Sequence, residues 1–549
     1  MRALRQLGRS ASSTLLLGRQ HHQQQHHEQD DAEELQLDGS QEQQTPLDKT
    51  LTKIGFGSYQ KKLLVLCGFG WLADNMWLQC VAVILPRVQD EWGISDNWIG
   101  MLSSSTFTGM MIGAWSWGSY SDSFGRVRAF NGTLLLTAFF GIAACFANSF
   151  TVLCFCFFGL GLGVGGSMPT DGTLFLENIP NEYHYLLTAL SVFFSLGAMI
   201  TSVIALIVIP TRSCQEDVKE CDVAKENTGW RMILGILAGI TLIFFCCRTL
   251  LFKLHESPRY LVTSGQKSEA VDVLRHIRDH NGDAFAIELA DVHDRDNLEM
   301  RSKGSGQYER LQNGRIEEDD ESAYRPGSTR DVEAAEGIKQ TKDSKTSLRE
   351  TVQDYFDRLS ELLQSKLRKV TLLTWSLWFT ASAAYTIFNV FMPKFLEEKL
   401  GSEAGTAGRV ESLQEYCFYT FAGLPGSLVG AYLEQRVGKK EAMAMATLGT
   451  ALGVLGFVFV SSQFAVLIAT MCISFMATLM YAIIYSYTPR LFPVSFRGSA
   501  TGIASALSRL AGMTAPIMTG VLLAFSTSLP LYIAAGLLLA TAGCMLALP

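Results

Sequence analysis

The sequence lacks the patterns that mark a nucleotide-driven or metal-dependent protein. The glycine-rich run from Gly159 to Gly166 is not followed by the Lys-Ser or Lys-Thr that a phosphate-binding loop requires. No cysteine and histidine spacing resembles a metal site, and no basic stripe suggests a nucleic-acid partner. ATP is thereby excluded as a direct driving force, and we expect neither an enzyme nor a bound cofactor.

Charged residues are also scarce, at 18% of the chain, whereas hydrophobic residues make up 48% and include 33 Phe. Runs of about 20 apolar residues recur, and a hydrocarbon layer of about 30 Å needs a helix of that length. We therefore predict an all-α membrane protein that lies in a lipid bilayer. The apolar runs give 12 transmembrane helices in two six-helix bundles, at 63–85, 98–117, 129–148, 150–171, 186–210 and 230–252, then at 370–392, 413–433, 442–461, 464–486, 500–525 and 529–548.

Composition divides the chain into four parts. Residues 1–60 are polar and are expected to form a disordered tail, and 61–253 form the first bundle. A central loop at 254–369 contains a short helix near 268–280, a charged disordered stretch at 288–349 and an amphipathic helix at 351–369. Residues 370–549 form the second bundle.

Lys and Arg residues flank one side of the predicted spans, which places both termini and the central loop in the cytosol. We expect the plasma membrane, with an internal membrane as the alternative. Cys214 and Cys221 share one polar loop on the other side, where an oxidising compartment would allow a disulfide between them.

A short polar hinge follows the second span of each half. The first runs from Gly118 to Arg128 and the second from Gly430 to Lys440, so the chain looks duplicated. Two related six-span halves joined by a long loop resemble the major facilitator superfamily. The resemblance also rests on Gly229-Trp230-Arg231 and on the segment from Glu256 to Leu261, which match sugar and organic-ion porters. Within that group, the motifs from Gly70 to Met76 and at Tyr487-Thr488-Pro489, with Pro493 and Arg497, are most similar to the branch related to synaptic vesicle glycoproteins.

The resemblance implies a cytosolic gate made of alternating charges and glycines. The alternative is that these are solvated loop charges that only obey the orientation rule. The candidate gate residues are Gly118, Asp122, Gly125, Arg126, Arg128, Glu177, Glu256 and Arg259 in the first half, and Glu434, Gly438, Lys439 and Arg497 in the second.

Asp74 is the strongest candidate for chemistry, because a carboxylate in mid-membrane costs about 2.5–3.5 kcal/mol on insertion scales. We expect it to face a central cavity and bind a proton or cation, between Trp71 and Trp77. Pairing with a neighbouring helix is the structural alternative. Arg509 lies equally deep, where it contacts an anionic substrate or pairs between helices, whereas Arg248 is expected to snorkel to the headgroups. Further cavity candidates are Tyr385, Asn389 and Tyr481.

Together these features predict a monomeric secondary active transporter of a small organic solute, charged or not, that works by alternating access and is driven by protons. The alternative from another class is a membrane receptor or scaffold that keeps the fold but binds partners through its tail and central loop.

Overall fold

The computed structural model describes residues 45–213, 226–252, 254–292, 362–364, 367–401, 406–492 and 494–548. In these ranges it contains twelve long helices and two bundles, which confirms the predicted fold class. The first bundle comprises α3 (Ser58–Trp92), α5 (Met101–Phe124), α6 (Arg126–Cys145), α7 (Phe150–Glu177), α8 (Leu186–Val208) and α10 (Gly229–Cys246). The second comprises α16 (Arg368–Gly401), α17 (Thr406–Arg436), α18 (Lys439–Phe459), α19 (Gln463–Tyr487), α20 (Val494–Leu523) and α21 (Ser528–Leu546).

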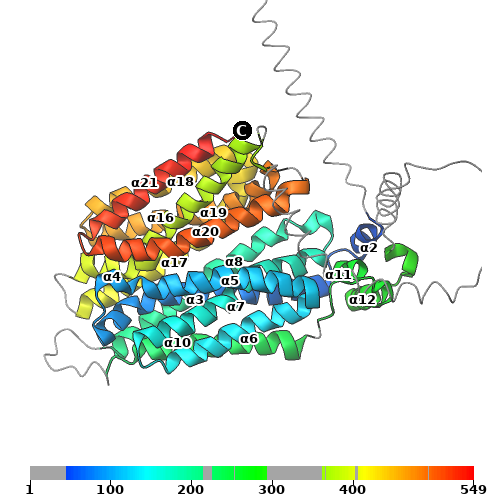
Figure 1. The fold of residues 1–549 in the computed structure, drawn as a ribbon, viewed down its shortest axis with the longest axis horizontal. Coiled ribbons are helices and arrows are strands. Elements are labelled where there is room, and N and C mark those ends of the chain that lie inside the picture. The colour runs from blue at the N-terminus through cyan, green and yellow to red at the C-terminus, as the bar shows by residue number, and fades with distance from the viewer. Residues whose placement is uncertain are drawn as a thin grey trace, which may run out of the picture.

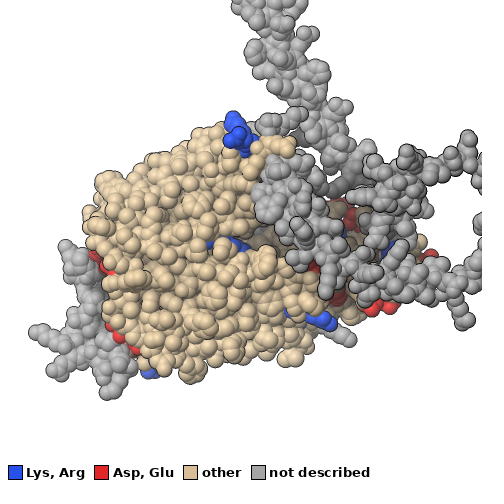
Figure 2. Space-filling model, in the orientation of Figure 1, with Lys and Arg blue, Asp and Glu red and all other residues tan. Residues whose placement is uncertain are grey.

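The two bundles lie side by side, with their helices running along the long axis of the molecule (Figure 1). We call the end that carries α2 (Pro46–Ile54), α11 (Pro258–Thr263) and α12 (Lys267–Asn281) the loop end. The other end, which carries α4 (Asp96–Ile99), is the far end. The visible surface between the ends is almost uncharged, and charged side chains gather mainly toward the two ends, as a membrane-spanning body requires (Figure 2).

Nine helices among the described residues are long and apolar enough to cross a membrane by composition alone. The helices α5, α16 and α17 complete the set of twelve despite their polar residues. Their polar side chains include Ser103, Ser382 and Asn389, which are buried against other helices. The cost of a polar side chain in lipid is avoided because these groups face protein.

The glycine-rich run of α7 allows close helix packing. A Cβ atom at Gly161 or Gly165 would overlap the backbone of α5, and one at Gly109 or Gly113 of α5 would overlap the backbone of α7. Small residues on both faces let the two backbones approach closely. This confirms the sequence interpretation of the run as a packing feature.

The duplicated hinges have the same backbone geometry. Gly125 ends α5 with φ 103°, and Gly438 precedes α18 with φ 104°. An L-residue with a side chain rarely adopts such a φ, so each turn requires glycine. The internal repeat seen in the sequence is therefore a repeat of structure as well.

The N-terminal tail contains more structure than the composition predicts. Residues 1–44 lie outside the described residues, but 46–54 form α2 instead of a disordered segment, which corrects the predicted boundary. The helix buries Leu47, Leu51 and Ile54 in a cluster that includes Leu274 of α12. A nine-residue helix is marginal by itself, so packing against α12 and the turn η4 (Leu289–Val292) stabilises it.

Several predicted features fall outside the described residues. These are the Cys214 and Cys221 pair, most of the charged stretch at 288–349, and residues 351–361 of the expected amphipathic helix. The short helix near 268–280 is present as α12.

Candidate functional site

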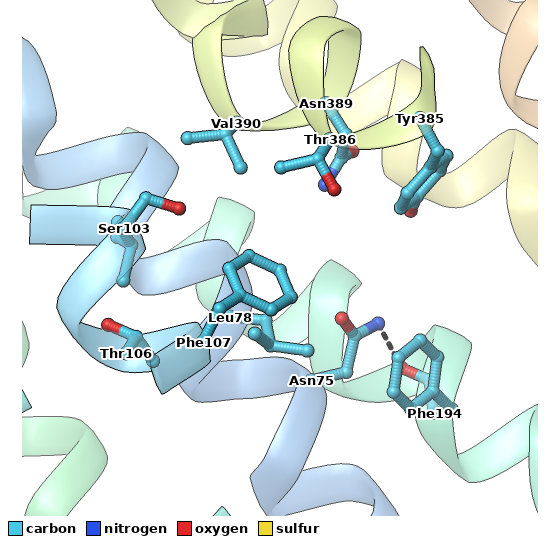
Figure 3. Close-up of a pocket in the computed structure, with 11 residues that line it drawn as sticks. Asn75, Leu78, Ser103, Thr106, Phe107, Phe194, Tyr385, Thr386, Asn389 and Val390 are labelled. Carbon is cyan, nitrogen blue, oxygen red and sulfur yellow. Dashed lines mark hydrogen bonds between the residues drawn. The ribbon is translucent and has the colours of Figure 1, made fainter. Parts of the chain in front are cut away.

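A pocket lies between the two bundles at the level of Asp74. In Figure 3, side chains from α3, α5 and α8 face side chains from α16 across this space. The lining residues are Asn75, Leu78, Val81, Ser103, Thr106, Phe107, Phe194, Tyr385, Thr386, Asn389 and Val390. The lining therefore consists of amides, hydroxyls, aromatic rings and aliphatic groups, with no charged side chain among these residues.

A network of neutral polar groups joins the bundles beside this pocket. Tyr416 of α17 donates a hydrogen bond to the Gln79 side chain of α3. Asn389 of α16 donates to Gln79 at 3.4 Å and accepts from the Tyr419 hydroxyl at 2.9 Å. All four side chains are buried. Because buried polar groups are costly unless satisfied, this network fixes the relative position of α3, α16 and α17.

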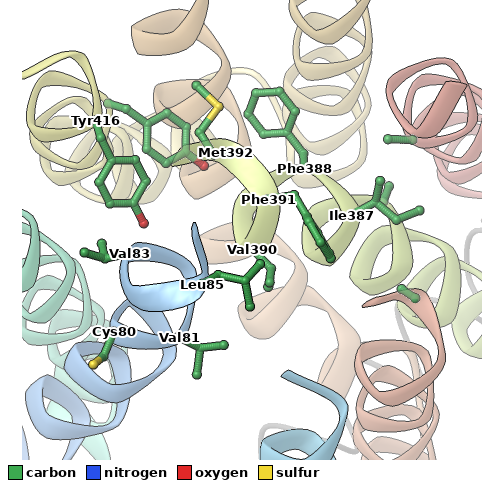
Figure 4. Close-up of a cluster of buried hydrophobic side chains, with 14 of the residues drawn as sticks. Cys80, Val81, Val83, Leu85, Ile387, Phe388, Val390, Phe391, Met392 and Tyr416 are labelled. Atoms are coloured by element: carbon green, nitrogen blue, oxygen red, sulfur yellow. The ribbon is translucent and has the colours of Figure 1, made fainter. Parts of the chain in front are cut away.

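An apolar cluster closes the pocket toward the far end. The cluster contains Cys80, Val81, Val83 and Leu85 of α3 and, from α16, Ile387, Phe388, Val390, Phe391 and Met392, with Tyr416 at the edge (Figure 4). Both helices run from the loop end to the far end, so this cluster lies on the far side of the pocket lining.

The structure brings some of the predicted cavity residues together and not others. Tyr385 and Asn389 line the pocket, and the ring of Tyr481 contacts that of Tyr385 at 5.2 Å between centroids. Trp71 is half-buried. Trp77 is fully buried inside the first bundle, where its indole N–H donates to the Thr241 hydroxyl of α10 at 3.0 Å. Trp77 therefore does not line the pocket, which corrects its predicted position.

Asp74 lies at the loop-end edge of the pocket, directly before the lining residue Asn75 of α3. It is one helical turn before Leu78, and the two residues share a face of α3. Its side chain is only 1% exposed, and neither carboxyl oxygen has a hydrogen-bond partner in the described part of the chain. Asp171, Arg248 and Arg509 are its electrostatic neighbours. Asp74 is thus a buried acid without a hydrogen bond, set next to the pocket rather than in its lining.

Arg248 does not snorkel, which makes that prediction wrong. It lies in η3 (Cys247–Leu251), a π-helical turn that extends α10, and it is fully buried. Its guanidinium donates to Asp171 at 2.7 Å and to the carbonyls of Leu66 and Phe130 at 3.0 and 2.7 Å. The guanidinium carbon of Arg248 lies over the face of the Phe130 ring, 3.6 Å from the ring centroid. These partners satisfy the cation inside the bundle, so it has no need to reach the headgroups.

Arg509 of α20 crosses between the bundles. It donates to the carbonyl oxygens of Met110 on α5 at 2.7 Å and Gly165 on α7 at 3.2 Å. In this structure the Arg509 side chain therefore links the bundles through backbone acceptors. Of its two predicted roles, substrate contact and pairing between helices, this is the second.

The candidate gate residues of the first half meet at the loop end. Arg126 pairs with Asp122 and, at 3.2 Å, with Glu177, while the Glu256 carboxylate accepts from its backbone N–H at 2.8 Å. Arg259 pairs with Asp48 of α2 at 2.6 Å. Gly118 is half-buried and Arg128 is exposed. In the second half Gly438 precedes α18 and Lys439 begins it, whereas the side chains of Glu434 and Arg497 lie outside the described residues.

The far end carries charged contacts between bundles that sequence reasoning missed. Arg87 of α3 pairs with Glu397 of α16 at 2.7 Å. Lys394 of α16 pairs with Asp96 of α4 and donates to Gln89 at 3.0 Å. Ser104 of α5 donates to the Met513 carbonyl of α20 at 2.8 Å. These contacts hold the bundles together at the far end.

Metal binding has no structural basis in the part of the chain that is described. No group of three or more His, Cys, Asp or Glu side chains is placed to hold an ion there.

Comparisons with known proteins agree with this architecture. The family model described as Major Facilitator Superfamily matches residues 65–489 and 374–549. The MFS siderochrome iron transporter 1 of Ceriporiopsis subvermispora is 30% identical over 502 residues, which cover 91% of this chain and 88% of that protein. The synaptic vesicle 2-related protein of Pongo abelii is 25% identical over 520 residues, covering 91% and 80%.

Among solved structures, the partially occluded inward open form of the xylose transporter XylE from E. coli superposes with a TM-score of 0.62. It is 14% identical in sequence, and the match covers 89% of this chain and 97% of that one, so it supports the fold alone. The family match confirms the resemblance to transporters, including relatives of synaptic vesicle proteins, and it excludes an enzyme. The chain is a multi-pass membrane transporter that belongs to the Major Facilitator Superfamily.

Proposed function

We propose that this transporter moves a small organic solute through the pocket between its bundles, and that proton binding at Asp74 drives the movement. The observation that carries the proposal is the Asp74 carboxyl, buried without a hydrogen bond next to the pocket lining. An ionised carboxylate in such a place is very costly, whereas the neutral acid is tolerated. Solvent that reaches Asp74 would reverse this balance, so the two states of the cycle would hold its proton differently.

The positions of the contacts between bundles support alternating access. Most hydrogen bonds and ion pairs between the described parts of the bundles lie between the pocket and the far end, at Gln79, Arg87, Ser104 and Lys394. The bonds from Arg509 to Met110 and Gly165 lie on the loop-end side of the pocket. The gate residues of the first half contact one another and α2, as Arg126 and Arg259 show. We therefore interpret the structure as the form closed at the far end. If the loop end is cytosolic, as the Lys and Arg pattern favours, this is the inward-facing form.

The solute class follows from the pocket and from the relatives. Amide and phenol groups offer hydrogen bonds, and the rings of Tyr385 and Phe107 offer apolar faces. Two of the transporters that this chain resembles are named for siderochrome iron and for xylose. A third, from Arabidopsis thaliana, is named for organic cations and carnitine. A small organic solute fits both observations.

The test is uptake into liposomes that contain the purified full-length chain, with a panel of radiolabelled organic acids, amines and sugars. At least one panel member should accumulate, and Asn389→Ala should reduce its uptake because Asn389 lines the pocket and holds Gln79. Asn97→Ala, which removes an exposed amide on α4, is the matched control. Binding of cytosolic partners without uptake of any panel member would favour the receptor or scaffold alternative.

A further inference from the structure

Asp171 and Arg248 form an ion pair that is fully enclosed in the first bundle. Both side chains have no solvent exposure, and their Oδ2 and Nη2 atoms are 2.7 Å apart. Two further N–H groups of Arg248 bind the Leu66 and Phe130 carbonyls, but Asp171 Oδ1 has no partner in the described part of the chain. The cation is thus satisfied, whereas the acid keeps one free acceptor atom.

This ion pair lies one helical turn from Asp74. A Cβ atom at Gly70 would overlap both Asp171 Oδ2 and Arg248 Nη2, so the pair packs directly against Gly70. Asp74 is four residues after Gly70, on the same face of α3, where neighbouring Cβ positions are about 5–6 Å apart. Leu78 of the pocket follows after a further turn. The face of α3 therefore presents, in order, the ion pair, Asp74 and the pocket.

The charges in this region leave one acid without a cation of its own. The ionisable groups around Asp74 are Asp171 of α7, Arg248 of η3 and Arg509 of α20, and Cys67 of α3 lies near Asp171 and Arg248. Arg248 is bound to Asp171, and Arg509 donates to backbone carbonyls. Ser167 lies beside Asp74, but its hydroxyl donates to the Gly163 carbonyl at 3.4 Å. The two arginines balance the two acids when both acids are ionised, but neither guanidinium bonds to Asp74, so Asp74 is the acid that lacks an ion-pair partner.

We propose that Asp171, held by Arg248, is the second proton-carrying acid of the transporter and receives the proton that Asp74 releases toward the loop end. The proposal rests on the function proposed above. In the transfer, the O–H bond of the Asp74 acid breaks and an O–H bond forms at Asp171, through the Ser167 hydroxyl or a water molecule. The charge of the three side chains is unchanged by this step, and Arg248 remains beside both carboxyl groups. Release of the proton from Asp171 to solvent completes the path.

The position of Asp171 gives the path its direction. The helix α7 runs from the far end to the loop end and stops at Glu177, six residues after Asp171. At 1.5 Å per residue the loop end is about 9 Å away along the helix. Asp171 is therefore nearer to the loop-end solution than Asp74 is, and the pocket lies on the other side of Asp74.

A solute-independent test follows the proton itself. The full-length chain is reconstituted in liposomes, and infrared difference spectra are recorded after a rapid rise in pH on the loop-end side. The carboxylic acid band that Asp74→Asn removes identifies Asp74, and its rate of loss measures deprotonation. The test variant is Asp171→Asn with Arg248→Gln, because Asp171→Asn alone would leave a buried cation unpaired and strongly destabilise the protein.

The neutral double variant should lose the Asp74 proton at least about a hundred-fold more slowly, the lower range of what a positioned acid or base contributes. The single variant Arg248→Lys, which keeps Asp171 and a cation beside it, should lose the Asp74 proton at close to the wild-type rate. Glu91→Gln removes a largely buried acid at the far end of α3 and should keep the wild-type rate. A wild-type rate in the double variant would show that the pair is structural only and would leave Asp74 as the coupling acid. The absence of any Asp74 band would overturn the proton-coupled function itself, and this inference with it.

Discussion

The substitution Gly70→Ala tests the placement of the buried ion pair most sharply. The added methyl group would lie closer than 3.0 Å to Asp171 Oδ2 and Arg248 Nη2, so both groups would have to move. Neither can move freely, because Arg248 is also bound to the Leu66 and Phe130 carbonyls. Overpacking costs about 1–3 kcal/mol, and full separation of a buried pair costs about 3–5 kcal/mol.

Replacing glycine by alanine inside a helix stabilises the helix by about 0.5–1 kcal/mol. We therefore expect Gly70→Ala to lower the free energy of unfolding by about 2–4 kcal/mol in total. The matched control is Gly239→Ala in α10, where an added Cβ atom meets nothing within 4 Å. Thermal unfolding of both variants in detergent, at one scan rate, gives the comparison. The reasoning would be refuted if Gly70→Ala unfolded at the same temperature as Gly239→Ala or above it.

Further predictions concern the contacts at the far end. Arg87→Ala should speed labelling of a Ser103→Cys pocket thiol by a membrane-impermeant reagent added at the far end, because the Arg87 and Glu397 pair closes that end. The charge exchange Arg87→Glu with Glu397→Arg should restore slow labelling. Equal labelling rates in the protein with native Arg87, in Arg87→Ala and in the charge exchange would contradict this role. Burial acts to raise the pKa of Asp96, but hydrogen bonds from Lys394 and Gln89 outweigh it and hold that pKa below its ordinary value. The Asp96 and Lys394 pair therefore stabilises the closed end at pH values above the usual pKa of Asp. This stabilisation is lost as the pH falls through the lowered pKa of Asp96. Acidification should speed labelling in wild type but not in Asp96→Asn, and an unchanged acid response in that variant would rule the pair out as its source.

The fold could be predicted from the sequence because its signals are local. Twenty-residue apolar runs and paired hinges indicate spans and a duplication without knowledge of any distant contact. Asp74 was also detectable, since a carboxylate in mid-membrane is costly wherever its helix faces. The helix α2 carried a local signal that composition obscured, because Thr45 and Asp48 form a capping box at its start.

The contacts of the site could not be predicted in the same way. Arg248 and Asp171 are 77 positions apart, and their meeting depends on the rotation of two helices and on the space that Gly70 leaves. Position near a span end suggested the headgroups for Arg248, but the π-helical turn η3 directs it inward. Gln79 and Tyr416 are neutral, so no charge penalty distinguishes them from other polar residues in apolar segments.

Proton-driven uptake is the most direct measurement of the central claim. Liposomes that contain the full-length chain are loaded with the solute found in the panel and exposed to an imposed pH gradient of either sign. We predict that the gradient drives solute movement in wild type, that its reversal reverses the movement, and that Asp74→Asn abolishes the response while solute exchange without a gradient continues. Uptake that ignores the pH gradient, or a response that persists in Asp74→Asn, would contradict the account.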